Sequence, residues 1–355
     1  MESRLGILLA LSLMAVAVVV PLAGADAGDT GDFSYKSQLD DNALLVYKEV
    51  GTATSITDTT RSFEVQFVSS NLFNNEEDAK TYAEYTVSNA LSALYLSNPM
   101  VPYIWNFPCV TVEVDPEISK VEVTSSTSVT TTYYVVDTIR FDLSVPEGIT
   151  SDSIKELEDA ISAINITGST DAKKVKSIIT YLDNLRFQQD EEGTVSNIYD
   201  ALVTKKTTSA GVAQAFVQLC TLNDIKAFTV CGDNLLTSKE DISYWNIVYL
   251  EGDIDGVTTY SWYLVDSAYC ADTGIAGYAT EIVDESKTYS MSAVHNKNLK
   301  LIGDNGLDTP QTAKDSYVQV GGPSFIELYG EKILLGALAV VMAVGMLYAV
   351  RSGNY

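Results

Sequence analysis

The chain has 355 residues, 46% of them hydrophobic, so it is long enough to bury one or two compact cores and to carry terminal segments as well. Its 47 acidic residues outnumber its 22 basic ones, and the net charge of -25 repels phosphate backbones, which excludes nucleic acid as a partner. The single histidine, His295, leaves little material for a histidine-based metal site or for a general base near neutral pH, so we expect no metal and no cofactor.

The first 25 residues have the pattern of a secretory signal peptide. Arg4 precedes an apolar run over residues 5–20, and the small-residue motif Ala23-Gly24-Ala25 follows it. Cleavage after Ala25 would expose an acidic, glycine-rich start to the mature chain, whereas an uncleaved segment would remain as a second anchor.

Residues 26–148 are expected to form a strand-rich α+β module. Alternating hydrophobicity at 62–68 and long Thr/Val/Tyr runs at 110–136 predict strands. One helix is predicted, over residues 76–96, because apolar side chains recur there at helical spacing. Pro146-Glu147-Gly148 then interrupts the chain, which sets the end of the module.

Residues 149–320 are expected to form a second domain, because helical patterns now come first and strands follow. The helical patterns lie at 152–164, 171–185, 196–203 and 209–222. The strand patterns lie at 226–230, 245–250 and 260–265. This order predicts helices packed on an antiparallel sheet.

Asn165-Ile166-Thr167 is the only N-glycosylation triplet in the chain. It lies between two helical patterns, where a loop is expected. Such triplets also arise by chance. Asn165 is therefore only a candidate glycosylation site, and it requires a host that glycosylates.

An uninterrupted apolar run extends from Ile333 to Val350, between Lys332 and Arg351. As a helix it would span about 27 Å at roughly 1.5 Å per residue, close to the hydrocarbon core of about 30 Å. The run therefore predicts a transmembrane helix over 333–350 and a cytoplasmic tail over 351–355, with a buried helix of a soluble core as the alternative. Together with the signal peptide, it predicts a single-pass membrane protein whose bulk is extracytoplasmic.

That location would permit disulfides among the four cysteines, which are Cys109, Cys220, Cys231 and Cys270. Their spacing does not determine the pairing. Cys220 has two interpretations, as a small buried core residue or as a disulfide partner of Cys231.

Three ordered motifs lie between residues 200 and 266. The first is D-A-L-V from Asp200, followed after a short turn by S-A-G-V-A-Q-A-F from Ser209. The second is S-Y-W-N-I-V from Ser243, and the third is W-Y-L-V-D from Trp262. In this order they resemble the D-A-L-V, C-x-G-Y-A-x-A-F, H-A-W-N-x-V and W-Y-x-V-D motifs of the transglutaminase-like superfamily, which implies a papain-like α+β fold over roughly residues 171–269.

The resemblance also implies the site. Active members use a cysteine thiolate at a helix N-terminus, a histidine that activates it and an aspartate that orients the histidine. The equivalent positions in this chain are Ser209, Ser243 and Asp266. A serine hydroxyl lacks the low pKa that lets a thiol ionise near neutrality. The resemblance therefore implies a degenerate triad that lacks its nucleophile and its base.

No other residue is a strong candidate for the two unfilled roles. Cys220 lies eleven positions beyond Ser209, roughly 16 Å along the same predicted helix, which is too far to replace the nucleophile. His295 lies in a polar stretch interpreted as a loop, from which it would have to fold back to act as a base. Asp266 alone is a weak base for an alcohol. Ser209 is accordingly interpreted as a helix cap.

Trp245, Asn246 and Trp262 have two interpretations. They are candidate ligand-groove residues, but alternation along sheet strands favours core packing for them.

Three hypotheses about function remain open. The first is a non-catalytic surface protein that binds a protein, a peptide or an envelope polymer. The second is an active hydrolase or acyltransferase, of protease or amidase type, with a serine nucleophile. The third is an architectural component of the cell envelope.

Overall fold

The computed structural model describes residues 31–68, 71–126, 128–183, 186–187, 195–234, 242–254, 257–267, 289–292, 307–310 and 312. The signal peptide predicted at 1–25, the helix predicted at 333–350, the tail at 351–355, Cys270 and His295 lie outside these residues. Within the described ranges, no helix is both long enough and apolar enough to cross a membrane.

The N-terminal part contains a short 3-10 turn, η1 (Tyr35–Gln38), and two helices, α1 (Asp41–Gly51) and α2 (Glu76–Ser97). Asp40 and Asn75 cap the two helices, each with a side-chain oxygen that accepts from a backbone N–H. The expectation of a single helix was therefore wrong, because α1 was missed. The signals were present, since Asp40 precedes a helical repeat of buried residues that includes Ala43, Val46 and Val50.

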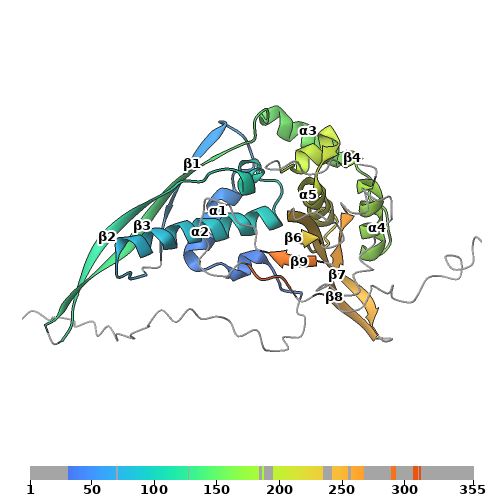
Figure 1. The fold of residues 1–355 in the computed structure, drawn as a ribbon. Coiled ribbons are helices and arrows are strands. Elements are labelled where there is room, and N and C mark those ends of the chain that lie inside the picture. The colour runs from blue at the N-terminus through green and yellow to red at the C-terminus, as the bar shows by residue number, and fades with distance from the viewer. Residues whose placement is uncertain are drawn as a thin grey trace, which may run out of the picture.

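A three-stranded antiparallel sheet accompanies these helices, in the order β1-β3-β2. Its strands are β1 (Thr60–Gln66), β2 (Val114–Thr124) and β3 (Thr130–Ser144), and the turns η2 (Pro102–Ile104) and η3 (Phe107–Cys109) precede β2. This part therefore combines an antiparallel sheet with two helices. β1 pairs only with residues 138–144 of β3, so β2 and the start of β3 continue past it as a two-stranded ribbon (Figure 1).

The second part has helices first and a sheet afterwards, as the sequence predicts (Figure 1). The helices are α3 (Ser151–Ser162), α4 (Asp171–Leu182), a π-helical turn η4 (Asp200–Thr204) and α5 (Ser209–Thr221). The strands are β4 (Arg186–Phe187), β5 (Lys206–Thr207), β6 (Ala227–Asn234), β7 (Ile242–Ile254), β8 (Val257–Val265) and β9 (Tyr289–Ser292). β4 and β5 form a short parallel pair, and the other four form an antiparallel sheet in the order β8-β7-β6-β9. The class of the fold is therefore α+β.

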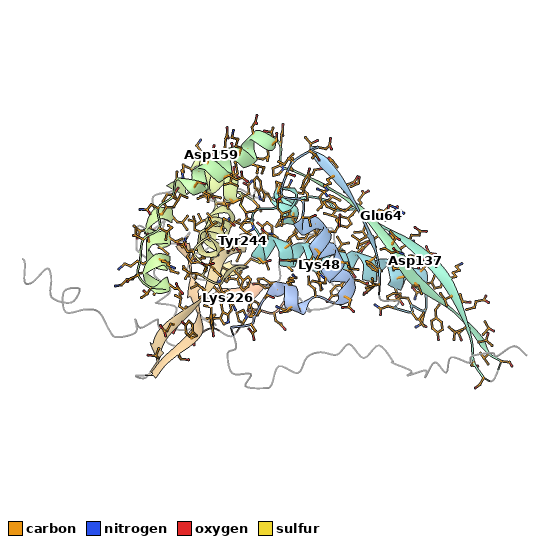
Figure 2. The ribbon with its side chains drawn as sticks, turned by 180° about the vertical axis from the view of Figure 1, so that it is seen from behind. Lys48, Glu64, Asp137, Asp159, Lys226 and Tyr244 are labelled. Carbon is orange, nitrogen blue, oxygen red and sulfur yellow. The ribbon has the colours of Figure 1, made fainter. Side chains whose placement is uncertain are left out.

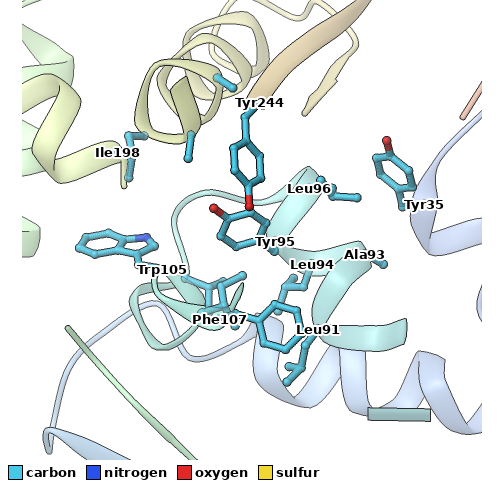
Figure 3. Packing of buried hydrophobic residues seen from close by; sticks show 14 of the residues in the cluster. Tyr35, Leu91, Ala93, Leu94, Tyr95, Leu96, Trp105, Phe107, Ile198 and Tyr244 are labelled. Atoms are coloured by element: carbon cyan, nitrogen blue, oxygen red, sulfur yellow. The ribbon is translucent and has the colours of Figure 1, made fainter. Parts of the chain in front are cut away.

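One hydrophobic core runs through both parts. The Tyr95 ring of α2 packs 6.1 Å from the Tyr244 ring of β7, measured between centroids (Figure 3). The Tyr35 hydroxyl donates to the Thr229 carbonyl of β6 at 3.0 Å. Phe33 lies edge-on to Trp262 of β8, with centroids 5.7 Å apart. The residues on either side of position 148 thus contribute to one cluster of buried hydrophobic side chains.

Candidate functional site

Ser209 is the first residue of α5, and the N-cap position belongs to Thr208. The expectation that Ser209 caps the helix was therefore off by one residue. Ser209 is only 5% exposed, and its Oγ accepts a hydrogen bond from the backbone N–H of Tyr244 at 3.1 Å. Because Tyr244 directly follows Ser243 on β7, this bond brings the first and second sequence motifs together at the start of α5.

Small hydroxyl side chains support the segment that leads into α5. The Ser196 Oγ accepts from the Thr208 backbone N–H at 2.7 Å and shares a second hydrogen bond with the Thr208 hydroxyl at 2.6 Å. It also contacts the Thr207 hydroxyl at 3.1 Å. Gln214, one turn into the helix, accepts from the backbone N–H of Ile198 at 3.1 Å. These groups are neutral hydroxyls and amides, so they fix the backbone but do not act as bases near neutral pH.

Gly211 allows α5 to approach the 196–207 segment closely. A Cβ at this position would lie 2.6 Å from the Asn197 carbonyl oxygen and 2.8 Å from the Ser196 Oγ, and it would also overlap the Thr207 Oγ1. Real Cβ contacts are longer than this, so the position admits no side chain without a shift of backbone. The glycine of the first motif thus has a packing reason in this chain.

The other two triad-equivalent positions lie on neighbouring strands. Ser243 is half-buried on β7 and pairs with Gly232 of β6. Asn246 of β7 pairs with Val265, the last residue of β8, so Asp266 begins the segment that leaves β8 beside the start of β7. The sheet order therefore brings Ser243 and Asp266 to the same end of the sheet. The resemblance to the transglutaminase-like motifs implies such a proximity.

Trp245, Asn246 and Trp262 are all buried, with at most 1% of each residue exposed. The Asn246 Nδ2 donates to the Ala213 carbonyl of α5 at 2.9 Å and to the Phe228 carbonyl at 3.4 Å. This side chain therefore links α5 to the sheet. The burial of all three agrees with the core-packing interpretation, and none of the three presents an open groove surface here.

Cys220 lies near the far end of α5, is fully buried and is a free thiol. Burial, and then the negative charge of Asp171, raise the pKa of the Cys220 thiol well above its ordinary value. A buried thiol with a raised pKa is a poor nucleophile, which supports its interpretation as a core residue. His295 lies outside the described residues, so its suggested role as a base stays a hypothesis.

Asn165 lies in the loop between α3 and α4, and its side chain is exposed. This placement is compatible with glycosylation. Among the residues that the structure describes, no group of three or more His, Cys, Asp or Glu side chains is arranged to hold a metal ion.

No family model matches the chain, and no curated protein sequence matches it. Three solved structures resemble its fold weakly. A candidate cysteine protease from Cytophaga hutchinsonii has 13% identity and a TM-score of 0.25, covering 44% of this chain and 64% of that protein. A structure described as a TGase has 12% identity and a TM-score of 0.27, covering 74% and 63%.

The third, a candidate protease from Parabacteroides distasonis ATCC 8503, has 10% identity and a TM-score of 0.23, covering 57% of this chain and 43% of that protein. This chain spans less than two thirds of the length of each of the three. Structural similarity with TM-scores this low does not support an argument about function. The case for a transglutaminase-like domain therefore depends on the motifs and on the geometry that joins them.

Proposed function

We propose that this chain is a cell-surface protein whose transglutaminase-like domain does not catalyse but binds a protein, a peptide or an envelope polymer. The observation that carries the proposal is the hydrogen bond from the Tyr244 backbone N–H to the Ser209 Oγ. The Ser209 hydroxyl, which stands where the family has its nucleophile, is therefore engaged in a contact between α5 and β7.

Two features of the site support the absence of catalysis. A serine becomes a nucleophile only when a base within about 3 Å takes its proton. The only histidine of the chain, His295, lies outside the described residues, and position 243 of β7, where the family has its histidine, carries a serine. The Ser209 residue is also only 5% exposed, and its Oγ already accepts the Tyr244 backbone N–H.

The motif residues that this chain does keep have structural roles. Gly211 permits close packing at the start of α5, and Asn246 joins α5 to β6 and β7 through its side-chain amide. A chain that retains the scaffold residues but not the nucleophile and the base fits a domain reused for binding.

The surface location is also part of the proposal. It is supported by the signal-peptide pattern at residues 1–25 and by the apolar run from Ile333 to Val350. The two segments together would hold the bulk of the acidic chain outside the membrane.

The test has two measurements. The purified full-length chain is assayed with amide, peptide and glutamine-donor substrates beside Ser209→Ala, and neither protein is expected to show turnover above the background reaction. Turnover that Ser209→Ala abolishes would contradict the proposal and favour the serine-hydrolase alternative. The chain is then immobilised and exposed to fractionated envelope material, where saturable binding is expected and its absence from every fraction would favour a purely architectural role.

A further inference from the structure

The β2–β3 ribbon extends beyond the part of the sheet that β1 completes. The ladder between β1 and β3 ends at the pair Gln66–Thr138. Past it, the Phe67 backbone N–H donates to the Asp137 carbonyl of β3, and Phe73 forms an isolated bridge with Tyr134. Figure 2 shows Asp137 where the ribbon leaves the body, with the side chains beyond it reaching into open space. Two-stranded ribbons are marginally stable alone, so this part of the sheet would gain from an added strand.

β2 is the edge strand of its sheet among the described strands, so its outer row of backbone N–H and C=O groups has no ladder partner there. Pro116 lies near the base of the strand, and a register shift follows between Glu117 and Ile118. Both features oppose further pairing near the body of the molecule. Residues 118–124 lie beyond them and contain no proline, so this segment is the part of the edge open to another strand.

The exposed side chains of this segment are of mixed character. Residues 119–122 are exposed on both faces of the ribbon, and this stretch contains Lys120, Val121 and Glu122. Val121 is 38% exposed, and Val129, in the turn directly before β3, is 60% exposed. The Lys120 Nζ lies 5.5 Å from the centroid of the Tyr134 ring, and its charge also acts on the Glu76 carboxylate at the start of α2. Within the hairpin, Lys120 and Glu122 lie opposite Tyr134 and Thr132, so neither charge has an oppositely charged cross-strand partner.

Symmetry limits how this edge can pair with a second copy of itself. Neighbouring pairs in an antiparallel ladder alternate between hydrogen-bonded and non-hydrogen-bonded types. Two residues that lie opposite each other must both be of the hydrogen-bonded or both of the non-hydrogen-bonded type, so their positions differ by an even number. A two-fold axis between two copies of the same strand therefore passes through a residue that lies opposite its own copy. An axis at Lys120 or at Glu122 would place like charges opposite each other. An axis at Val121 places Lys120 opposite Glu122 of the other copy, twice, and places the two exposed valines together.

We propose that residues 118–124 of β2 pair with the same segment of a second copy of this chain, antiparallel and about a two-fold axis at Val121. The two ribbons would then form one continuous four-stranded sheet that bridges two molecules. We choose a second copy as the partner because of the charge pattern. Only a two-fold axis at Val121 places Lys120 of one copy opposite Glu122 of the other.

Disulfide trapping tests the register. In either type of antiparallel pair, the Cα atoms at position 121 would be about 4.5–5.5 Å apart, within the range of a disulfide. The full-length chain carrying Val121→Cys is therefore expected to form a reducible dimer under mild oxidation. Val129→Cys is the matched control, because the two copies of that position would lie roughly 20 Å or more apart. The parent chain, which contains the native cysteines, accounts for background.

Charge reversal tests the partner, with Val121→Cys in every protein. Lys120→Glu alone and Glu122→Lys alone are each expected to reduce the dimer yield roughly tenfold, because each places like charges opposite each other twice. Lys120→Glu with Glu122→Lys in one chain is expected to restore it. An equimolar mixture of the two single variants, tagged differently, is expected to yield mainly the mixed dimer.

Several results would overturn the proposal. One is equal trapping at positions 121 and 129, and another is a Val121→Cys chain that stays monomeric at every concentration. A third is a dimer yield that the charge reversals leave unchanged, which would show that Lys120 and Glu122 do not pair across the axis. Circular dichroism of each variant confirms that the chain is folded before trapping is compared.

Discussion

The backbone N–H of Tyr244 donates to the Oγ of Ser209 at 3.1 Å, across 35 residues of sequence. Both groups are buried, and the bond joins the first turn of α5 to β7. The motif resemblance equates Ser209 with a nucleophile and Ser243, next to Tyr244, with a histidine. In this chain the same proximity holds two secondary-structure elements together.

Ser209→Ala is expected to lower the free energy of unfolding by about 1–3 kcal/mol, because the buried Tyr244 amide would lose its acceptor. Urea denaturation of the parent and the variant measures the change. Ser243→Ala is the matched control, since it removes a hydroxyl one residue away from Tyr244, and it is expected to cost less than about 0.5 kcal/mol. If the two substitutions lower the free energy of unfolding equally, the hydrogen bond of Ser209 contributes no more to stability than the Ser243 hydroxyl does.

Thiol chemistry is expected only when Ser209 and Ser243 are both replaced by the cysteine and the histidine that the motif resemblance implies. Ser209→Cys puts a thiol at a helix N-terminus, and Ser243→His adds an imidazole beside it. At pH 7 a thiol of ordinary pKa is only a few per cent ionised, so a paired thiol would be alkylated roughly tenfold faster than in Ser209→Cys alone. The measurement is the pH profile of iodoacetamide labelling at position 209. Identical profiles for the single and double variants would mean that position 243 does not reach the thiol.

The contact between α5 and β7 could be expected from the sequence, because the motifs that carry the resemblance are contiguous. Each motif fixes one element, and the order of the elements brings Ser209 near the start of β7 and places Asp266 beside it. The bond itself could not be predicted, because a backbone N–H carries no residue-specific signal. The offset at the helix cap has a similar origin, since Thr208 and Ser209 are both good capping residues and sequence alone does not choose between them.

The sequence predicts the class of the fold and the order of its elements, but not the contacts between distant elements. The α+β class and the helix-then-sheet order follow from periodicity, but the packing of Phe33 on Trp262 joins positions 229 residues apart, and no local pattern reports such a contact. The same holds for Tyr95 against Tyr244, which unites the two parts that the sequence separates at residue 148. A proline and a glycine at 146 and 148 mark a turn, and turns occur within domains as well as between them.

Gly211→Ala is expected to destabilise the chain by about 1–3 kcal/mol or more, because the added methyl group would overlap the Asn197 carbonyl and the Ser196 hydroxyl. In an unobstructed helix the same change would stabilise by up to about 1 kcal/mol, so the sign of the effect is diagnostic. Thermal unfolding gives the readout. Gly51→Ala at the end of α1 is the control, since its nearest neighbour would be the Leu94 Cδ1 at 3.5 Å, an ordinary contact. A stabilised Gly211→Ala chain would contradict the packing described for α5.

The Cys220 thiol is expected to resist alkylation in the native chain. It is fully buried, and burial raises its pKa, so both access and ionisation are suppressed. Peptide mapping after iodoacetamide treatment at pH 8 should show roughly tenfold less label at this position in the native than in the urea-unfolded protein. Comparable labelling in the two states would imply that α5 opens readily and that its buried face is not the rigid support inferred for the site.

Asp183→Asn is expected to stabilise the chain at neutral pH and to have little effect in acid. Asp183 is the C-cap of α4, and its Oδ1 is buried with no hydrogen-bond partner among the described residues. Burial raises the pKa of this carboxyl above its ordinary value of about 3.9. The folded chain therefore holds this proton more tightly than the unfolded chain does, so stability falls as pH rises from the ordinary pKa through the raised one.

Asparagine avoids that loss, and it also removes a negative charge from a helix C-terminus, a change worth on the order of 0.5 kcal/mol. The difference in unfolding midpoint between Asp183→Asn and the parent should thus be small near pH 3 and should grow toward pH 7. Asp142→Asn, at an exposed position of β3, is the control for the general effect of removing one charge from a chain of net charge -25. If both variants gain equally across this range, the effect belongs to the net charge of the protein and not to the buried oxygen at the end of α4.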